Sequence, residues 1–159
     1  MMQNMIIGPY YTEPDRCIFT VWAPFSEKVE LLLTKDGNRK IAMEKDELGY
    51  WRLEISNPPE ELRYLFRIDQ KVERPDPASH FQPDGVHKPS QVINHRLFPW
   101  TDGGWRGIPL RDYIIYELHV GTFTSSGTFE AAIDRLGHLK ELGVNVIELM
   151  PVAQFPGRR

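Results

Sequence analysis

Hydrophobic side chains in roughly the first hundred residues recur at every second position, which is typical of half-buried β-strands. In residues 16–24, Cys17, Phe19 and Val21 fall on one face of the predicted strand. Similar runs follow about every dozen residues with turn-forming residues between them, at 29–33, 39–45, 50–56 and 63–69. This spacing predicts an all-β sandwich without helices.

The composition of the chain changes over residues 73–110, where six prolines fall between positions 75 and 109. Prolines at this density exclude a helix and disfavour a central strand. The same stretch carries Phe81, Trp100 and Trp105, and flexible linkers rarely hold so much apolar bulk. We expect an ordered, extended segment that packs along the sandwich and into the following domain, with Trp100 and Trp105 fixing it there.

The last part of the chain alternates strand and helix patterns. Residues 113–120 are β-rich, 121–127 predict a loop, and 144–150 form a second strand pattern that is almost entirely apolar. Between them, Thr128 is placed to cap a helix over 129–142, and Gly143 suits the left-handed position after it. The helix has one apolar stripe, made of Phe129, Ala132, Ile133, Leu136, Leu139 and Leu142. The pattern predicts one right-handed βαβ unit.

One βαβ unit cannot cover both faces of its own sheet, whereas a (β/α)8 barrel takes about 250 residues. The 159-residue chain is therefore expected to contain only the start of such a barrel. The predicted fold class is mainly β: an N-terminal sandwich domain with a proline-rich extension over 1–98, a linker over 99–110, and over 111–159 the first βαβ unit of a truncated TIM barrel.

Charge and cysteine content exclude several classes of function. The net charge is -3 with a sequence pI near 6.0, and no Lys or Arg run indicates a nucleic-acid partner. The single cysteine, Cys17, has no internal disulfide partner and is expected in the core of a protein from the reducing cytoplasm. No secretory signal and no stretch of eighteen apolar residues is found, so we expect no membrane segment.

Two glutamates on the predicted barrel strands are the most tempting catalytic candidates. Glu117 shares a strand face with His119, and Glu148 lies on the next strand, so both carboxylates could point into a barrel. Polar residues inside barrels also commonly hydrogen-bond to neighbouring strands, and we favour this structural role. The five histidines show no metal-ligand spacing and no Gly-x-Ser-x-Gly frame occurs. The sequence therefore nominates no catalytic residue, no metal and no cofactor.

Aromatic side chains of the sandwich offer a second kind of site, because exposed Trp and Tyr can stack on sugar rings. Candidates are Tyr10, Tyr11, Trp22, Tyr50 and Trp51. Strand tryptophans usually pack in the core, so we expect Trp22 and Trp51 to be buried. Substrate-binding residues stay unassigned at this point.

Several short motifs resemble a known group of enzymes. FTVWAP at residues 19–24, YELHVGTFT at 116–124 and the pattern over 143–151 resemble the α-amylase superfamily, in which branching and isoamylase-type debranching enzymes carry an immunoglobulin-like N-terminal domain. RPDPAS at 74–79, QPDGVH at 82–87 and ELMPV at 148–152, with GTF at 127–129, are similar to the maltooligosyltrehalose trehalohydrolase family. Asp69-Gln70 replaces an expected Asp-Gly, which should alter one hairpin turn.

The resemblance implies an immunoglobulin-like sandwich and a retaining, two-carboxylate hydrolase that releases trehalose from maltooligosyltrehalose or a related α-glucan. In that family the catalytic carboxylates follow the fourth, fifth and seventh barrel strands, which lie beyond Arg159, so none is carried over and the chain alone is expected to be inactive. Two alternatives stay open: the N-terminal part of a branching or debranching enzyme, and a non-catalytic glucan-binding sandwich.

Overall fold

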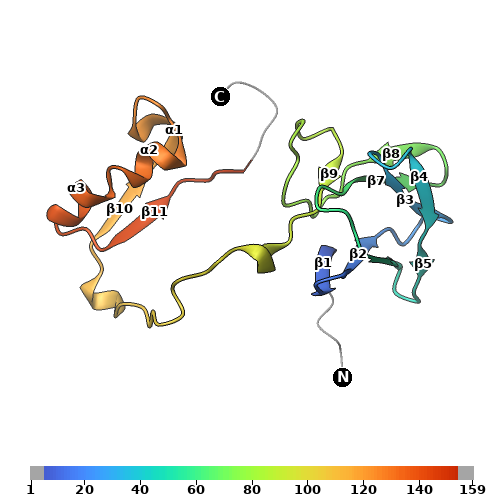
Figure 1. Ribbon diagram of the computed structural model, residues 1–159, viewed down its shortest axis with the longest axis horizontal. Coiled ribbons are helices and arrows are strands. Elements are labelled where there is room, and N and C mark those ends of the chain that lie inside the picture. Colours follow the sequence, from blue (N-terminus) through green and yellow to red (C-terminus); the bar gives the residue numbers. More distant parts are fainter. Residues whose placement is uncertain (1–5, 154–159) are drawn as a thin grey trace. The chain divides into compact units, whose positions relative to one another are not determined.

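The computed structural model describes residues 6–153, which fall into two compact units. The first unit ends at Pro99 and the second begins at Trp100. Figure 1 labels their strands and helices. Each unit is described below by itself.

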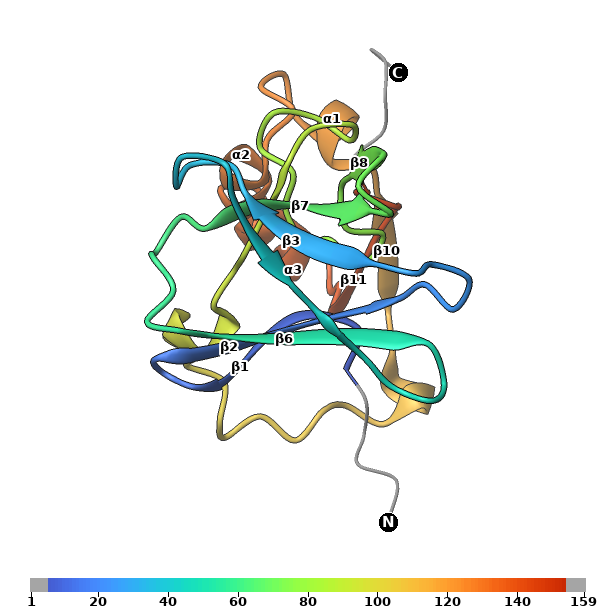
Figure 2. The same cartoon turned by 90° about the vertical axis from the view of Figure 1, so that its right-hand side faces the viewer.

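The first unit is a sandwich of two antiparallel sheets, which Figure 2 shows as two layers. One layer, the β2–β6 sheet, has the order β1 (Gly8–Glu13), β2 (Arg16–Trp22), β6 (Tyr50–Ser56) and β5 (Glu44–Lys45). The other layer, the β3–β7 sheet, has the order β4 (Arg39–Ala42), β3 (Val29–Leu33), β7 (Arg63–Ile68) and β8 (Val72–Arg74). A short strand, β9 (Ser90–Gln91), also pairs with β7. The mainly β prediction is confirmed.

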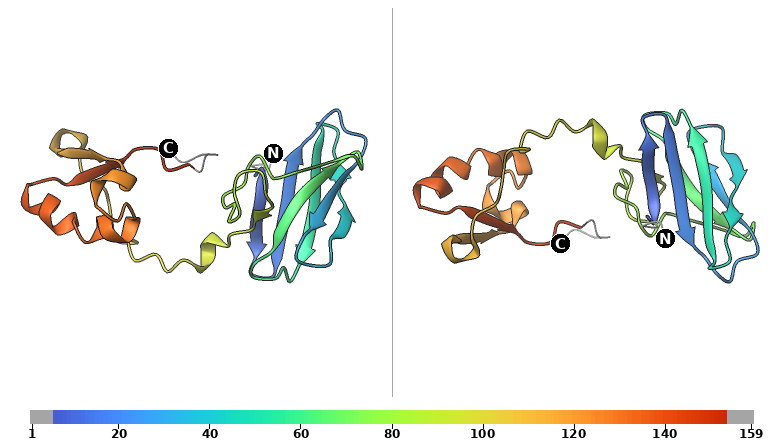
Figure 3. Two further views of the ribbon diagram at one scale, coloured as in Figure 1. Left: turned by 90° about the horizontal axis from the view of Figure 1, so that it is seen from above. Right: turned by 90° about the horizontal axis from the view of Figure 1, so that it is seen from below.

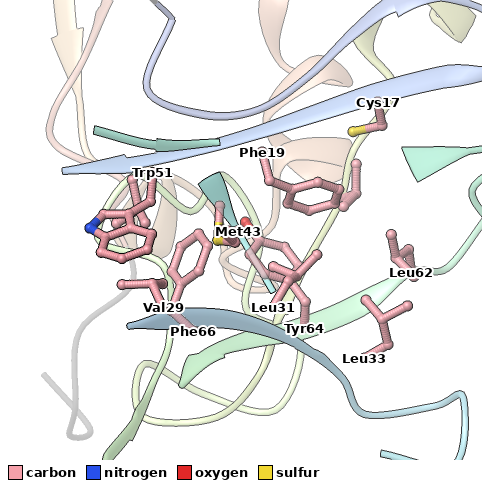
Figure 4. Close-up of a cluster of buried hydrophobic side chains, with 12 residues drawn as sticks. Cys17, Phe19, Val29, Leu31, Leu33, Met43, Trp51, Leu62, Tyr64 and Phe66 are labelled. Atoms are coloured by element: carbon pink, nitrogen blue, oxygen red, sulfur yellow. The ribbon is translucent and has the colours of Figure 1, made fainter. Parts of the chain in front are cut away.

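The core lies between the two sheets and follows directly from the period-two pattern. Cys17, Phe19 and Val21 point inward from β2 and are at most 4% exposed. Figure 4 shows Cys17 and Phe19 on the side of β2 that faces β3 and β7, and the Tyr64 ring lies edge-on to Phe19 at 5.0 Å between centroids. Alternation places every second residue of each strand in this layer. The residues between them, on the other face of each strand, form the outer faces of the sandwich.

One predicted strand of this unit is divided between the two sheets. The pattern predicted a single strand over 39–45, but β4 pairs with β3 while β5 pairs with β6. Met43 lies between them, 5% exposed, with its backbone N–H bonded to the Val29 carbonyl at 3.0 Å. The buried Met43 side chain fills the core at the point where the chain crosses between layers. Strands β1, β8 and β9 were not predicted.

The proline-rich segment is ordered against the sandwich over only part of its length. Asp76, Ser90 and Val92 are buried, and the Val92 N–H bonds to the Leu62 carbonyl at 3.0 Å. A 3-10 turn, η1 (His95–Leu97), follows. From the last residue of this turn onward large apolar side chains are exposed: Leu97, Trp100, Trp105 and Leu110 are each between 69% and 78% accessible. That Trp100 and Trp105 fix the segment to a barrel stays a prediction.

The second unit contains two parallel strands with helical segments between them in sequence. After a 3-10 turn, η2 (Leu110–Asp112), β10 (Ile115–Leu118) pairs with β11 (Val146–Leu149) in parallel. The helices α1 (Val120–Phe123), α2 (Phe129–Ile133) and α3 (Leu136–Glu141) lie along one side of the pair, as Figures 1 and 3 show. A small cluster of Leu118, Val120 and Leu139 joins them.

Two local predictions in this unit need correction. The predicted loop over 121–127 begins as helix α1, and the single helix predicted over 129–142 is divided into α2 and α3. At the division the Arg135 N–H bonds to the Ala132 carbonyl at 3.0 Å, an i→i−3 bond that tightens the chain. Asp134, which lies at the break, is a weak helix former. The cap at Thr128 and the left-handed Gly143 are found as predicted.

Candidate functional site

Glu117 and Glu148 are brought together by the pairing of β10 with β11. They are direct partners in the parallel register, so their Cα atoms are separated by about one interstrand spacing, ~4.8 Å. Leu118, the next residue of β10, is buried under the helices, so alternation directs Glu117 to the opposite face of the strand pair. Both carboxylates are exposed to solvent.

The surroundings of these two carboxylates do not form a catalytic site. Neither glutamate makes an ion pair or a side-chain hydrogen bond within residues 6–153. His119 lies beyond the end of β10, and its Nδ1 is 3.2 Å from the Thr122 hydroxyl. Glycosidases need one carboxyl group held protonated in an apolar setting beside an ionised one. The described residues supply no apolar cover over this face.

The aromatic candidates of the sandwich separate into buried and exposed side chains. Trp51 is 5% exposed, donates its indole N–H to the Ala23 carbonyl at 2.9 Å, and lies 5.3 Å from the Lys45 ammonium. Trp22 is instead 56% exposed, so the prediction of a buried Trp22 is wrong. Tyr10 and Tyr50 are partly exposed. Among the strand tryptophans, Trp22 alone is available to a ligand.

The histidines do not assemble a metal site. Among residues 6–153, no group of three or more His, Cys, Asp or Glu side chains could hold a metal ion. Two histidines do meet, since His80 Nδ1 lies 3.0 Å from His95 Nε2. His87, His119 and His138 are exposed elsewhere. The close pair links the proline-rich segment to the η1 turn.

A buried polar cluster escaped the sequence analysis. Asp76 is 3% exposed and accepts hydrogen bonds from the Tyr64 hydroxyl at 2.6 Å and from the Ala78 N–H at 2.7 Å. The Asp76 backbone N–H donates to the Ser90 hydroxyl at 3.1 Å. Burial raises the pKa of Asp76 and these hydrogen bonds partly oppose the rise. The cluster fastens the proline-rich segment onto β7, so its role is structural.

The comparisons with known proteins agree with this architecture. Residues 7–81, nearly the whole sandwich, match the family described as carbohydrate-binding module 48, the isoamylase N-terminal domain. The crystal structure of a protein provisionally assigned as an alpha amylase, from Salmonella typhimurium, superposes with a TM-score of 0.88 at 38% identity, covering 96% of this chain and 26% of that one. In sequence and in fold the chain is therefore similar to the N-terminal region of enzymes of the α-amylase family.

Several of the more similar relatives are malto-oligosyltrehalose trehalohydrolases, and a 1,4-alpha-glucan branching enzyme of Vibrio cholerae is 28% identical over 156 residues, 87% of this chain and 21% of that enzyme. The malto-oligosyltrehalose trehalohydrolase of Saccharolobus solfataricus is 45% identical over 150 residues, which are 94% of this chain and 26% of that enzyme. The enzyme of the same name from Deinococcus radiodurans is 50% identical over 111 residues, 70% of this chain and 18% of that enzyme. The resemblance to trehalohydrolases is confirmed, and the chain spans about a quarter of the length of the first of these relatives.

None of the helices among residues 6–153 is long and apolar enough to cross a membrane.

Proposed function

We propose that this chain is the N-terminal part of a hydrolase that cleaves the α-1,4 bond next to a terminal trehalosyl unit and releases trehalose. The observation that carries the proposal is the extent of the similarity. It runs without a change of relative through the sandwich, the proline-rich segment and the β10–β11 unit, at 45% identity over 150 residues. A shared sandwich alone would leave the reaction open, because one fold serves many functions.

The second unit supports the proposal that residues 111–159 begin a (β/α)8 barrel. Parallel strands joined by helices are the repeating unit of that barrel. β10 and β11 have this order and direction, yet each carries exposed apolar side chains, with Ile115 at 52% and Leu149 at 47%. Further strands on both edges of the pair and further helices would cover these side chains. In the same proposal, residues 1–98 form an immunoglobulin-like domain and 99–110 a linker.

The chemistry of the proposed reaction belongs to residues outside this chain. Retaining glycoside hydrolysis requires a nucleophilic carboxylate and a second carboxylic acid that protonates the leaving oxygen. Glu117 and Glu148 occupy the face that would point into the closed barrel, where we assign them to hydrogen bonding between strands. The 159-residue chain is accordingly inactive by itself, and its substrate in the whole enzyme is maltooligosyltrehalose or a related α-glucan. We place that enzyme in the cytoplasm, where the unpaired Cys17 thiol would stay reduced.

The test compares this chain with the proposed longer enzyme of which it would be the N-terminal part. Both are incubated with maltotriosyltrehalose, and trehalose and branched products are separated by anion-exchange chromatography. The longer protein is expected to release trehalose, and the 159-residue chain is expected to release none. New α-1,6 branches without trehalose would replace the proposal by a branching enzyme. Cleavage of existing α-1,6 branches alone would replace it by a debranching enzyme.

The variant E117Q/E148Q in the longer protein tests the assignment of the two glutamates. Trehalose release should fall by less than about tenfold, because an interstrand hydrogen bond contributes only about 1 kcal/mol. A loss of several orders of magnitude with an intact fold would show that at least one of them is catalytic.

A further inference from the structure

A pair of histidines, His80 and His95, joins the proline-rich segment to the η1 turn within the first unit. His80 Nδ1 lies 3.0 Å from His95 Nε2, and the two ring centroids are 5.1 Å apart. Ring nitrogens at this distance form a hydrogen bond only when one carries a proton and the other offers a lone pair. The contact therefore depends on how many protons the two imidazoles hold together.

Three protonation states of the pair have different consequences for the contact. When both rings are neutral, the N–H of one ring donates to the other, and one added proton keeps this hydrogen bond with a charged donor. A second added proton puts an N–H on both facing nitrogens, so neither can accept, and two positive charges oppose each other across 3.0 Å. The doubly protonated pair cannot keep the contact.

The proline-rich segment brings a negative charge to the His80 side of the pair. Burial raises the pKa of Asp76, whereas its hydrogen bonds and the charge of His80 lower it. Asp76 and His80 therefore attract each other when both are charged. This attraction favours a first added proton on His80, which donates it to His95 and keeps the contact closed.

The His95 side of the pair has different surroundings. Within residues 6–153, His95 forms no ion pair with an acid. Its neighbour in η1, Arg96, is itself positive, and its Nη1 donates to the Thr12 carbonyl of β1 at 2.9 Å. The acid that follows Thr12, Glu13, pairs with an arginine of β2 at 3.8 Å. A second proton therefore adds to the positive charges of His80 and Arg96.

Few contacts hold η1 to the sandwich. The last buried residue before the turn is Val92, whose N–H bonds to the Leu62 carbonyl at 3.0 Å. Among the described residues, η1 is tied to distant parts of the unit by two side-chain hydrogen bonds, one through His95 and one through Arg96. Leu97, at the end of the turn, is 72% exposed. Opening the histidine contact therefore removes one of the two bonds that fix the turn.

We propose that the His80–His95 contact is a pH-sensitive latch, which holds η1 on the sandwich at neutral pH and releases it when both imidazoles are protonated. Histidine side chains ordinarily change charge between about pH 5 and 8, so the latch works in a physiological range. Release moves the point at which the chain leaves the sandwich from Leu97 back toward Val92. The segment that leads to the second unit becomes longer and more mobile in acid. The inference uses contacts of the first unit alone and does not depend on the proposed function.

The test follows the imidazole C–H signals and the backbone amides of the labelled 159-residue chain from about pH 8 to about pH 4.5 by NMR. The His80 and His95 signals, assigned by their absence in H80A and H95A, should titrate in two steps at least about one pH unit apart, a tenfold difference in proton affinity. The ¹⁵N heteronuclear NOE values of Arg96 and Leu97 report the order of η1 and should fall with the lower step. Amide signals of β2 and β7 should keep their native dispersion, which separates release of the turn from unfolding.

Variants of His80 distinguish the latch from a general effect of acid. In H80A, His95 should titrate in a single step, and the NOE values of Arg96 and Leu97 should be as low at pH 7.5 as those of the parent chain at pH 4.5. The amide of H80N occupies the place of Nδ1 and can either donate or accept, so this variant should keep η1 ordered throughout. H87A is the matched control, because His87 is exposed on the same segment and lies outside the pair. It should retain both steps.

The latch is overturned if the two histidines titrate in independent single steps in the parent chain, or if the NOE values of Arg96 and Leu97 do not change with pH. It is equally overturned if H80A leaves η1 ordered at pH 7.5, or if H87A removes the pH dependence as completely as H80A does.

Discussion

The carboxyl group of Asp76 holds the proline-rich segment against the sandwich and is also the most deeply buried acid described. It is 3% exposed, and its strongest partner is the Tyr64 hydroxyl at 2.6 Å. Burial raises the pKa of Tyr64 as well, so the phenol keeps its proton and remains the donor. Desolvation by burial raises the pKa of Asp76, and it outweighs the hydrogen bonds from Tyr64 and Ala78 and the charge interaction with His80, which lower it.

The raised pKa of Asp76 predicts a pH-dependent contribution to stability. At pH values just above 3.8, the ordinary pKa of an aspartic acid, Asp76 keeps its proton in the folded state but has lost it in the unfolded state. Stability therefore falls as the pH rises from about 3 through the folded-state pKa. The variant D76N does not titrate at this position. Urea unfolding at pH 3–7 should show the parent chain losing stability relative to D76N as pH rises. The raised pKa would be contradicted if the difference in free energy of unfolding between the parent chain and D76N stayed constant, or if it moved in favour of the parent chain, as the pH rises.

Cys17 gives a second prediction at this scale. The thiol is 0% exposed, and burial raises its pKa to about 12, so almost no thiolate exists at neutral pH. At pH 7.5 the native chain should react with Ellman's reagent at least a hundredfold more slowly than the chain in 8 M urea. The unfolded chain serves as the control for reagent quality. Rapid reaction of the native chain would mean that the β2 edge of the core opens frequently.

Individual residues show where sequence analysis succeeds and where it stops. The period-two pattern correctly placed Phe19 and Val21 in the core, because alternation is a local property of a strand. The same pattern put Trp22 on the other face, but the usual preference of tryptophan for burial was given more weight, and this was wrong. Asp76 could not be found locally, since its partners Tyr64 and Ser90 are brought to it by the fold.

Among the structural elements, the turn before β6 is the most tightly constrained. Gly49 has a φ of +85°, and a Cβ atom there would lie 2.6 Å from both the Cα and the Cβ of Pro24. The Ala23 N–H bonds to the Gly49 carbonyl at 3.1 Å, and Lys45 Nζ bonds to the Pro24 carbonyl at 2.8 Å. The two loops are thus fixed to each other, and the clash cannot be relieved by a flexible side chain.

Gly49→Ala is accordingly expected to destabilise the sandwich by about 3 kcal/mol or more, combining backbone strain with the clash. Gly37→Ala is the matched control, because Gly37 also has a positive φ, +58°, but has nothing within 4 Å of a new Cβ. Its cost should be about 1 kcal/mol. Both are measured by urea unfolding. If the two variants lost equal free energy of unfolding, backbone strain alone, without the contact to Pro24, would explain the need for glycine at position 49.

Element boundaries were predictable wherever a local signal exists. Thr128 accepts the Ala131 N–H at 3.2 Å as a cap should, and Gly143 has a φ of +88°. The β7–β8 turn at Asp69-Gln70 has positive φ at both residues, the geometry of a tight type I′ hairpin without the usual glycine. The division of residues 39–45 between two sheets had no local signal, because both halves keep the same alternation and only the partners of each strand differ.

At the scale of the whole chain, the two units differ in how much apolar surface they bury. The sandwich has a continuous core between its sheets, whereas the main core cluster of the second unit contains only Leu118, Val120 and Leu139. Large apolar side chains of β10, α2 and β11 stay exposed, among them Ile115, Ile133 and Leu149. Period and helix propensity predicted the two strands and the helical region between them, but not α1 or the division into α2 and α3. Nothing in the sequence itself shows what covers these exposed side chains.

This asymmetry predicts unequal protection of the two units against hydrogen exchange. Burying one large apolar side chain contributes about 1.5–3 kcal/mol to stability. A unit that leaves several of them in water therefore has a low free energy of unfolding. In the 159-residue chain, amides of β2, β3, β6 and β7 should exchange at least a hundredfold more slowly than those of β10, α3 and β11. In the longer protein the β10 and β11 amides should become protected, because added strands and helices would bury Ile115 and Leu149. Equal protection of both units in the short chain would show that the second unit is stable without a barrel around it.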